Sequence, residues 1–282
     1  MSDHILTNLQ YLHTMRQLTR NICGVFFGKE ALKKKMFSIV NMIRSAVGCE
    51  AVAIRLELDG DYPYYVYDGF TVTFIERESS LLVKDATQQP IPCADGCGYL
   101  LDCMCGRVIR GNTDSRKPYF TENGSFCSNN TTALLASTTE AERGGSTRNY
   151  CNACGYQSVA LIPIVYREET MGLIQLNDRS PDMLYKEQIC ILENIADQLA
   201  VSIKNDHILN SIEASLENRY HASRRVYRMC SSCKSVNTRD NRWKPVEAFI
   251  SKISDIQLSH TICPHCQSAK YDNIFTEHPE KH

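Results

Sequence analysis

Two long stretches of the chain repeat apolar residues with the spacing of a helix. Residues 31–43 place Leu32, Met36, Ile39, Val40 and Ile43 on one helical face. A longer apolar seam follows Ser180-Pro181, a pair typical of a helix N-cap with proline at the first helical position. We expect this second helix to run from Pro181 to about Tyr220. A third, N-terminal helix is predicted within residues 1–27.

The pattern between these helices changes to the alternation of β-strands. Residues 51–58 and 62–67 form one predicted strand pair around a turn, and residues 158–166 and 171–178 form another around 167–170. The long segment 71–157 lies between the pairs. A structureless insert of that length is unusual in a compact domain, so we expect it to hold short helices, one or two strands and the ligand site. The pattern predicts an α+β fold with an antiparallel sheet and flanking helices.

Charge and composition limit the partners and the cellular compartment that we expect for the protein. The chain carries 31 Lys+Arg against 32 Asp+Glu, which gives no global attraction to nucleic acid or an anionic membrane. The N-terminal residues lack the pattern of a signal peptide, and no apolar run of about 18 residues spans a bilayer. We therefore expect a cytoplasmic protein. Its 14 cysteines then indicate metal or redox chemistry more than a disulfide framework.

Four cysteines near the C-terminus form two C-x-x-C pairs, Cys230 with Cys233 and Cys263 with Cys266. Two such turns supply the four thiolates of a tetrahedral zinc site, although the spacer exceeds the usual roughly 15–20 residues. The spacer predicts a short helix near Pro245. We expect residues 227–282 to form a small zinc-ribbon-like module, with a redox dithiol pair or a metal-free segment as alternatives.

The C-terminal motifs also resemble a known signalling module. Residues 229–234 (MCSSCK), 243–247 (WKPVE) and 258–266 (LSHTICPHC) are similar to a short module that follows sensor domains in many bacterial signalling proteins. The resemblance implies a signalling context and no particular reaction.

The central region resembles a GAF domain. The resemblance rests on the order of predicted elements and on SVALIPI at 158–164 followed by GLIQLND at 172–178, and it spans roughly residues 28–205. It implies an antiparallel sheet with helices on one face and a pocket on the other, roofed by the cysteine-rich segment 71–157. Residues 206–226 would then be a connecting helix before the zinc module.

A narrower resemblance lies within that roof. The segments DCMCGRVI at 102–109, FTENGSF at 120–126, TTALLASTT at 131–139 and TRNYCNACGYQSV at 147–159 are similar to a GAF subgroup attached to bacterial and archaeal histidine kinases. Carried over by position, this resemblance assigns cofactor binding to Cys103, Cys105 and Cys151. The chain departs from the subgroup at Leu82, where the subgroup often has a cysteine, and at Cys127, where it has an aromatic residue.

Three further cysteines, Cys93, Cys97 and Cys154, are additional to the subgroup pattern, and one of them could supply a fourth ligand. Thiolates suit iron–sulfur clusters, zinc and copper(I), so an iron–sulfur cluster or a second metal is the favoured cofactor. Reactive thiols, a disulfide and simple packing remain alternatives. The isolated Cys23, Cys49 and Cys190 are interpreted as buried packing residues.

These observations favour a sensory GAF protein that detects redox state or a gas and signals through another chain. The flanking helices predict a parallel homodimer, and the signalling context predicts a protein partner. Two alternatives stay open: a cysteine-based reductase of the free methionine sulfoxide reductase type, and a zinc-dependent adaptor for protein or nucleic acid. No catalytic residue is singled out, and the sequence contains no phosphate-binding loop and no H-E-x-x-H motif.

Overall fold

The computed structural model describes residues 2–26, 28, 30–94, 96, 98–145, 147–223, 227–238, 240–253, 259, 261 and 263. The side chains of residues 2–12 and 217–223 are outside this description. The chain divides into two compact units, Met1–Ile212 and Glu213–His282. Within the described part, no helix is both long enough and apolar enough to cross a membrane.

A five-stranded antiparallel sheet forms the centre of the first unit, in the order β2-β1-β5-β4-β3. The strands are β1 (Ala51–Leu56), β2 (Tyr64–Asp68), β3 (Phe126–Ser128), β4 (Ser158–Tyr166) and β5 (Glu169–Asp178). Both predicted strand pairs are confirmed, and the β4–β5 connection is tighter than expected because Tyr166 already pairs with Glu169. Arg167 has a φ of 59°, a left-handed conformation that a two-residue hairpin turn requires.

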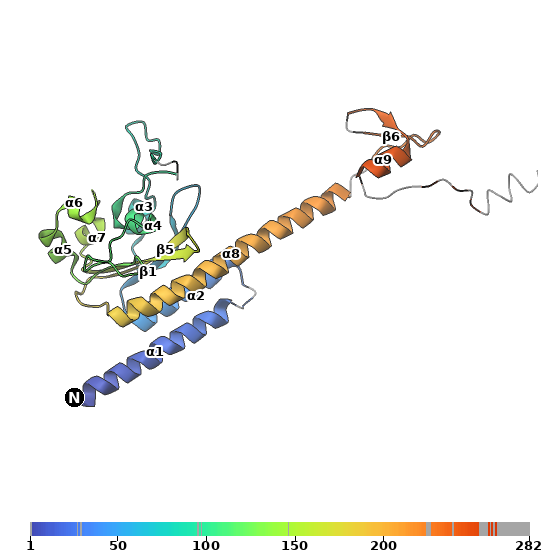
Figure 1. Cartoon of the computed structure of the whole chain (residues 1–282). Helices are drawn as coiled ribbons and strands as arrows, with labels where there is room; N and C mark the ends of the chain where they lie inside the picture. The colour runs from blue at the N-terminus through green and yellow to red at the C-terminus, as the bar shows by residue number, and fades with distance from the viewer. Residues whose placement is uncertain are drawn as a thin grey trace, which may run out of the picture. The chain divides into compact units, whose positions relative to one another are not determined.

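Three long helices cover one side of the sheet, which we call the apolar face (Figure 1). They are α1 (Ser2–Phe26), α2 (Leu32–Val47) and α8 (Lys186–Ser223). Alternate residues of the central strands, such as Val52, Ile54 and Ile174, meet the apolar seams of these helices in one hydrophobic core. This is the ordinary result of period-two strands packing against period-3.6 helices.

Five short helices cover the opposite side of the sheet, which we call the thiol face (Figure 1). They are α3 (Val72–Glu78), α4 (Cys103–Ile109), α5 (Thr131–Ser137), α6 (Glu140–Arg143) and α7 (Tyr150–Ala153). With β3, these helices confirm the expectation of short elements within segment 71–157. The segment between α3 and α4 is an irregular ribbon with isolated bridges, for example between Leu82 and Leu101 and between Pro92 and Tyr99.

The predicted start of the long helix at Pro181 is wrong. Asp182 has a φ of 58°, which breaks a right-handed helix, and α8 begins at Lys186. The preceding turn is tied to the sheet, because the Ser158 hydroxyl donates to the Ser180 carbonyl at 2.8 Å and accepts from the Met183 amide at 3.2 Å. The helix starts where the Gln188 side chain accepts a hydrogen bond from the Tyr185 amide at 2.8 Å.

The described part of the second unit contains β6 (Val236–Asn237), β7 (Trp243–Lys244) and α9 (Val246–Ile253). The strands pair in an antiparallel ribbon, and α9 confirms the helix predicted near Pro245. Phe249 is buried against the ring of Tyr227, with ring centroids 4.5 Å apart. So small a cluster is consistent with a module that has little core of its own.

Candidate functional site

Cys103, Cys105 and Cys151 line one small cavity on the thiol face, which we call the thiol cavity. Its volume is about 70 Å³, and its walls come from α4, α5, α7 and the strand β4. Cys103 and Cys105 lie on α4, whereas Cys151 is distant in sequence and lies on α7. The fold therefore brings together the three cysteines that the family resemblance had grouped.

The start of α4 holds Cys103 in an unusual conformation. Asp102 caps the helix, and its carboxylate accepts a hydrogen bond from the Cys103 amide at 2.6 Å. Cys103 has a φ of 65°, a left-handed conformation that costs energy for a residue with a Cβ atom. Strain of this kind is retained where the surrounding structure fixes it, and it often marks a functional position.

The three thiols differ in their tendency to ionise. The Cys105 thiol donates a hydrogen bond to the Cys103 sulfur, which lowers the pKa of Cys103 to about 7. The same hydrogen bond, together with burial, raises the pKa of Cys105 well above its usual value. Burial raises the pKa of Cys151 to about 12. At neutral pH the site therefore holds one thiol poised to form a thiolate beside two that stay protonated.

A buried arginine lies beneath the thiols on strand β1. Arg55 is 1% exposed, and its guanidinium donates to the carbonyls of Tyr62 at 2.8 Å, Ser79 at 2.9 Å and Glu78 at 2.6 Å. It also stacks on the ring of Tyr64, 3.5 Å from the ring centroid. Its positive charge favours the thiolate forms of Cys105 and Cys151. This effect is smaller than those of burial and neighbouring groups, so the pKa values of both cysteines are still raised overall.

Polar side chains of β5 complete the floor of the site. Gln175 accepts a hydrogen bond from the Tyr64 hydroxyl at 3.0 Å and donates one to the Asn177 side chain at 3.0 Å. Its amide nitrogen also lies 3.8 Å from the Cys151 sulfur. Gln175 and Asn177 are each 1% exposed, so this polar row is fully internal. Most buried polar groups are hydrogen-bonded, and here the Asn177 amide nitrogen is the exception, because it is buried without a hydrogen-bond partner among the described residues.

Arg148 joins the end of α3 to the beginning of α4. It lies 3.2 Å from the Asp102 carboxylate and 3.5 Å from that of Glu78, and it donates to the Ser80 carbonyl at 3.0 Å. Burial raises the pKa of Glu78 in spite of the nearby arginines. Through Asp102, Arg148 holds the helix cap beside Cys103, and its positive charge also lowers the pKa of Cys103.

The other cysteines predicted for this site lie elsewhere. Cys154 follows α7 and interacts with Tyr150, a lining residue of the thiol cavity, but Cys154 itself does not line that cavity. Cys93 lines a larger neighbouring cavity that also touches Cys103. Cys97 lies outside the described residues. Within the part of the chain that the structure describes, no three His, Cys, Asp or Glu side chains are close enough together to hold a metal ion.

The predicted zinc ligands are described only in part. Cys230 and Cys233 lie in one turn, where the Cys230 amide donates to the Ser235 carbonyl at 2.8 Å. Hydrogen bonding to the Ser235 side chain lowers the pKa of Cys233 to about 7. Cys263 is exposed, and Cys266 lies outside the described residues.

Sequence reasoning missed Arg55, Gln175 and Asn177 as parts of the site. The detectable pattern was polar residues at alternate positions of strands that are otherwise apolar, at residue 55 and again at 175 and 177. Arg148, which is near the cysteines in sequence, is half-buried between the carboxylates of Asp102 and Glu78. Cys49 is buried as predicted, but Cys190 is exposed, contrary to its interpretation as a packing residue.

The fold and the roofed site define a small α+β domain built on one antiparallel sheet. The sequence profile of the GAF domain matches residues 36–203, more than half of the chain, and the protein therefore belongs to the GAF domain family. This match confirms the family and the fold predicted for the central region. A comparison with curated protein sequences found no match.

Solved structures with a similar fold include the GAF domain of a phosphoenolpyruvate-protein phosphotransferase from Coxiella burnetii. It is 14% identical with a TM-score of 0.48, covering 72% of this chain and 98% of that one. A domain assigned to a two-component sensor histidine kinase of Sinorhizobium meliloti 1021 is 13% identical with a TM-score of 0.43, covering 66% and 99%. The type II free methionine-R-sulfoxide reductase of Thermoplasma acidophilum is 13% identical with a TM-score of 0.41, covering 61% and 92%. Likenesses at this level carry no argument about function.

Proposed function

We propose that the protein is a sensory GAF module in which Cys103, Cys105 and Cys151 act as one thiol centre. The centre would bind an iron–sulfur cluster or another thiolate-preferring metal, report redox state or a gas, and signal through another chain. The observation that carries this proposal is the convergence of three thiols from α4 and α7 on one cavity. Soft thiolate donors favour such metals over hard cations.

Thiolates are suitable ligands for this cofactor, but the three thiols would have to change position to bind one metal ion. Because no three candidate ligands among the described residues are close enough for one ion, ligation by all three thiols requires them to move. A fourth donor would come from Cys93, Cys97 or Cys154. When bound, the metal centre would supply a site at which an oxidant or a gas can react. The protein's part is to hold the thiols, with Arg148 fixing the α4 cap.

Metal and sulfide analysis of protein purified without oxygen tests this proposal. We expect iron with sulfide, or a metal in excess of the C-terminal zinc, together with a visible absorption band if a cluster forms. The Cys103→Ser/Cys105→Ser/Cys151→Ser protein should lose this metal, whereas Cys49→Ser, a change in the apolar core, should retain it. A colourless protein without extra metal after anaerobic reconstitution would overturn the proposal.

The C-terminal cysteines, Cys230, Cys233, Cys263 and Cys266, are proposed to bind one structural zinc ion. Support comes from the turn that carries Cys230 and Cys233 and from the small core around Phe249. In a module of this size the metal supplies much of the folding free energy. We expect one zinc per chain, lost in the Cys230→Ser protein and retained in Ser231→Ala. A wild-type protein that contains no zinc would contradict this assignment.

The output of the sensor is proposed to pass through the helices and a partner chain. Helix α8 exposes Leu209, Ile212 and Leu216, whose spacing of three and then four residues is that of a coiled-coil seam. We therefore propose a parallel homodimer, built on these flanking helices, that contacts a signalling protein. Light scattering should give twice the chain mass of 32.0 kDa, and Leu209→Glu should reduce it toward the monomer. A wild-type monomer would contradict the dimer.

A second candidate function is reduction of free methionine sulfoxide, which the Cys103–Cys105 pair favours. The Cys103 thiolate would take the sulfoxide oxygen, becoming a sulfenic acid while the substrate becomes a thioether. Cys105 would then condense with it, releasing water and forming a disulfide that an external dithiol reduces. Dithiol-dependent turnover that is lost in Cys103→Ser would support this reaction. Absence of turnover by the wild-type protein would exclude it.

A further inference from the structure

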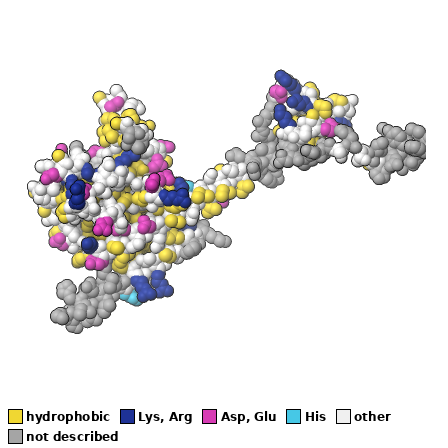
Figure 2. Space-filling view, viewed as in Figure 1, with side chains coloured by type: hydrophobic (Ala, Val, Ile, Leu, Met, Phe, Trp, Pro, Cys, Tyr) yellow, Lys and Arg dark blue, Asp and Glu magenta, His cyan; other side chains and the backbone are white. Residues whose placement is uncertain are grey.

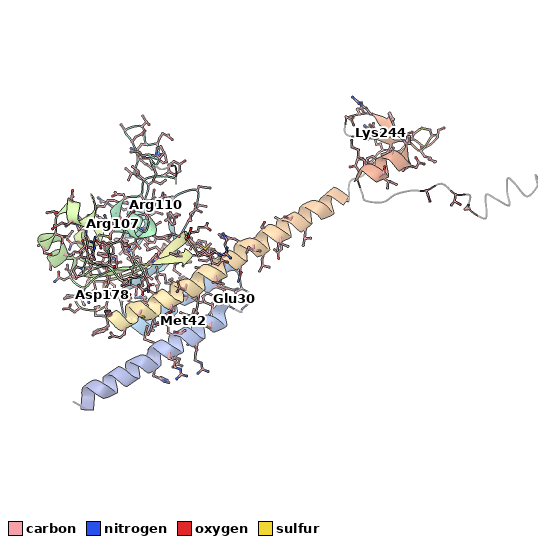
Figure 3. All side chains as sticks on the ribbon, in the orientation of Figure 1. Glu30, Met42, Arg107, Arg110, Asp178 and Lys244 are labelled. Atoms are coloured by element: carbon pink, nitrogen blue, oxygen red, sulfur yellow. The ribbon has the colours of Figure 1, made fainter. Side chains whose placement is uncertain are left out.

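A second, larger cavity lies beside the thiol cavity and carries positive charge. It has a volume of about 790 Å³ and is bounded by α4, by residues 143–145 and 147, and by the end of the β4–β5 hairpin. Its lining includes Arg107, Arg110 and Arg143, so we call it the arginine cavity. Figure 3 shows Arg107 and Arg110 together on the α4 side of the sheet, opposite Met42 on the apolar face. The volume is that of an ordinary small-molecule site.

Arg143 is an internal cation with unused hydrogen-bonding capacity. It is 6% exposed, and one terminal nitrogen donates to the carbonyl and the hydroxyl of Thr138. Its Nε atom is buried and has no hydrogen-bond partner among the described residues. The neighbouring Glu142 carboxylate is held by Thr139, from whose amide and hydroxyl it accepts hydrogen bonds at 2.7 and 2.9 Å. Glu142 forms no ion pair with Arg143 among the described residues, so it supplies no acceptor for the Arg143 Nε atom.

Arg107 is held at the cavity by a close approach to the backbone. A Cβ atom at Gly144 would fall 0.9 Å from a guanidinium nitrogen of Arg107, so the guanidinium occupies the space that any other residue would fill. Gly144 also has a φ of 88°, which favours glycine. The Arg107 Nε atom is buried without a hydrogen-bond partner among the described residues. The guanidinium also lies 6.0 Å from the centroid of the Phe120 ring, so the fold places the side chain but leaves its Nε donor without an acceptor among the described residues.

Among the described residues, neither Arg107 nor Arg143 lies within ion-pair distance of an acidic side chain, although Arg143 is near enough to Glu142 to lower the pKa of that carboxyl. Glu168 and Glu169 also line the cavity, but both are exposed at the hairpin, and Glu169 pairs with Lys204 at 3.0 Å. A partly buried guanidinium that lacks an anionic partner is costly, so the cavity favours an anion.

We propose that the arginine cavity binds a small oxyanion, a carboxylate or phosphoryl group, through Arg107 and Arg143. The planar guanidinium fork matches the oxygens of both groups. Cys103, Arg143 and Thr147 line this cavity and the thiol cavity alike, so a bound anion would lie next to the thiol centre. The proposal goes beyond the sensory function above and does not depend on a metal at the thiols.

Titration calorimetry on the reduced full-length protein tests the site, with succinate as the carboxylate probe and inorganic phosphate as the phosphoryl probe. We expect one of these anions to bind one site per chain. Arg107→Gln and Arg143→Gln should each weaken it by about tenfold or more, the usual effect of losing a charge-assisted hydrogen bond. The control is Arg116→Gln, which removes an exposed arginine that pairs with Asp114 outside the cavity.

Because Arg143 is buried, Arg143→Gln could unfold the domain, and Arg143→Lys provides the second variant. It keeps the positive charge and loses the planar fork, so it should bind more weakly than wild type and more tightly than Arg143→Gln. The same anion should raise the melting temperature of wild type and not that of Arg107→Gln. Failure of both probes to bind wild type, or wild-type affinity in both glutamine variants, would overturn the proposal.

Discussion

The two faces of the GAF sheet are both covered by helices, but they bury different kinds of side chain. The apolar face meets three long helices, and its core consists of hydrophobic side chains together with Cys49. The thiol face meets five short helices and buries Arg55, Gln175 and Asn177 on its strands. Over them lie the buried Cys105 and the half-buried Cys103 and Cys151 of α4 and α7. The difference separates stability, which hydrophobic burial supplies, from chemistry, which requires polar groups held away from water.

Charge on the outer surface does not distinguish the two faces of the sheet. On the face shown in Figure 2, Lys and Arg side chains are interspersed with Asp and Glu over the first unit. The thiol face instead buries the charged residues Arg55 and Glu78, and the half-buried Arg148 pairs with Glu78. The two faces therefore differ in the side chains that they bury.

The largest expected effect comes from a cavity in the apolar face. Leu192 of α8 is 0% exposed, and Leu192→Ala should lower the free energy of unfolding by about 3–5 kcal/mol. Leu58→Ala is the matched control, because Leu58 is 60% exposed and its truncation should change stability by less than about 0.5 kcal/mol. Urea unfolding followed by circular dichroism measures both. Equal losses of unfolding free energy in the two variants would show that burial of the apolar residues of α8 does not stabilise the domain.

A smaller loss is expected from the polar interior of the thiol face. Arg55→Met removes the donors to three carbonyls, at Tyr62, Ser79 and Glu78, and should cost about 2–4 kcal/mol. The control is Arg44→Met, which breaks a partly exposed pair with Asp68 and should cost below about 1 kcal/mol. The same urea titrations apply. An Arg55→Met protein as stable as wild type would mean that the buried arginine has no structural role.

The smallest effect is a difference in thiol reactivity that leaves the fold intact. In metal-free, reduced protein, Cys103 should react with iodoacetamide at a rate that rises through pH about 7, because its pKa is lowered to that value. Cys127, half-buried against the apolar core, should stay slow until the pH approaches about 11, since burial raises its pKa. Mass spectrometry of alkylated peptides follows both sites. Identical pH profiles would contradict the distinction between the faces.

The sequence predicted the apolar face well because its pattern is local. The seam of α2 and the alternation in β1, β4 and β5 each extend over one element, so they can be detected without knowledge of the rest of the fold. The failure at the start of α8 has the same origin. Ser180-Pro181 satisfies a local capping rule, but Ser158, a residue of β4, ties the turn to the sheet and delays the helix to Lys186.

The thiol face was predictable only through resemblance. Nothing in the spacing of Cys103, Cys105 and Cys151 indicates that α7 brings the third thiol to the first two. The contacts of Arg55 with carbonyls beyond its own strand also depend on tertiary packing. Such contacts depend on the fold as a whole. A single sequence therefore shows which residue types are present but not which of them lie close together in space.

We propose that Cys103, Cys105 and Cys151 form one metal-binding centre. Alkylation of the anaerobically purified protein, followed by mass spectrometry before and after treatment with iron and zinc chelators under reducing conditions, tests this directly. Chelation should increase labelling of these three cysteines together and leave labelling of Cys127 unchanged. Labelling of the three that is indifferent to chelation, or that changes at only one of them, would contradict it.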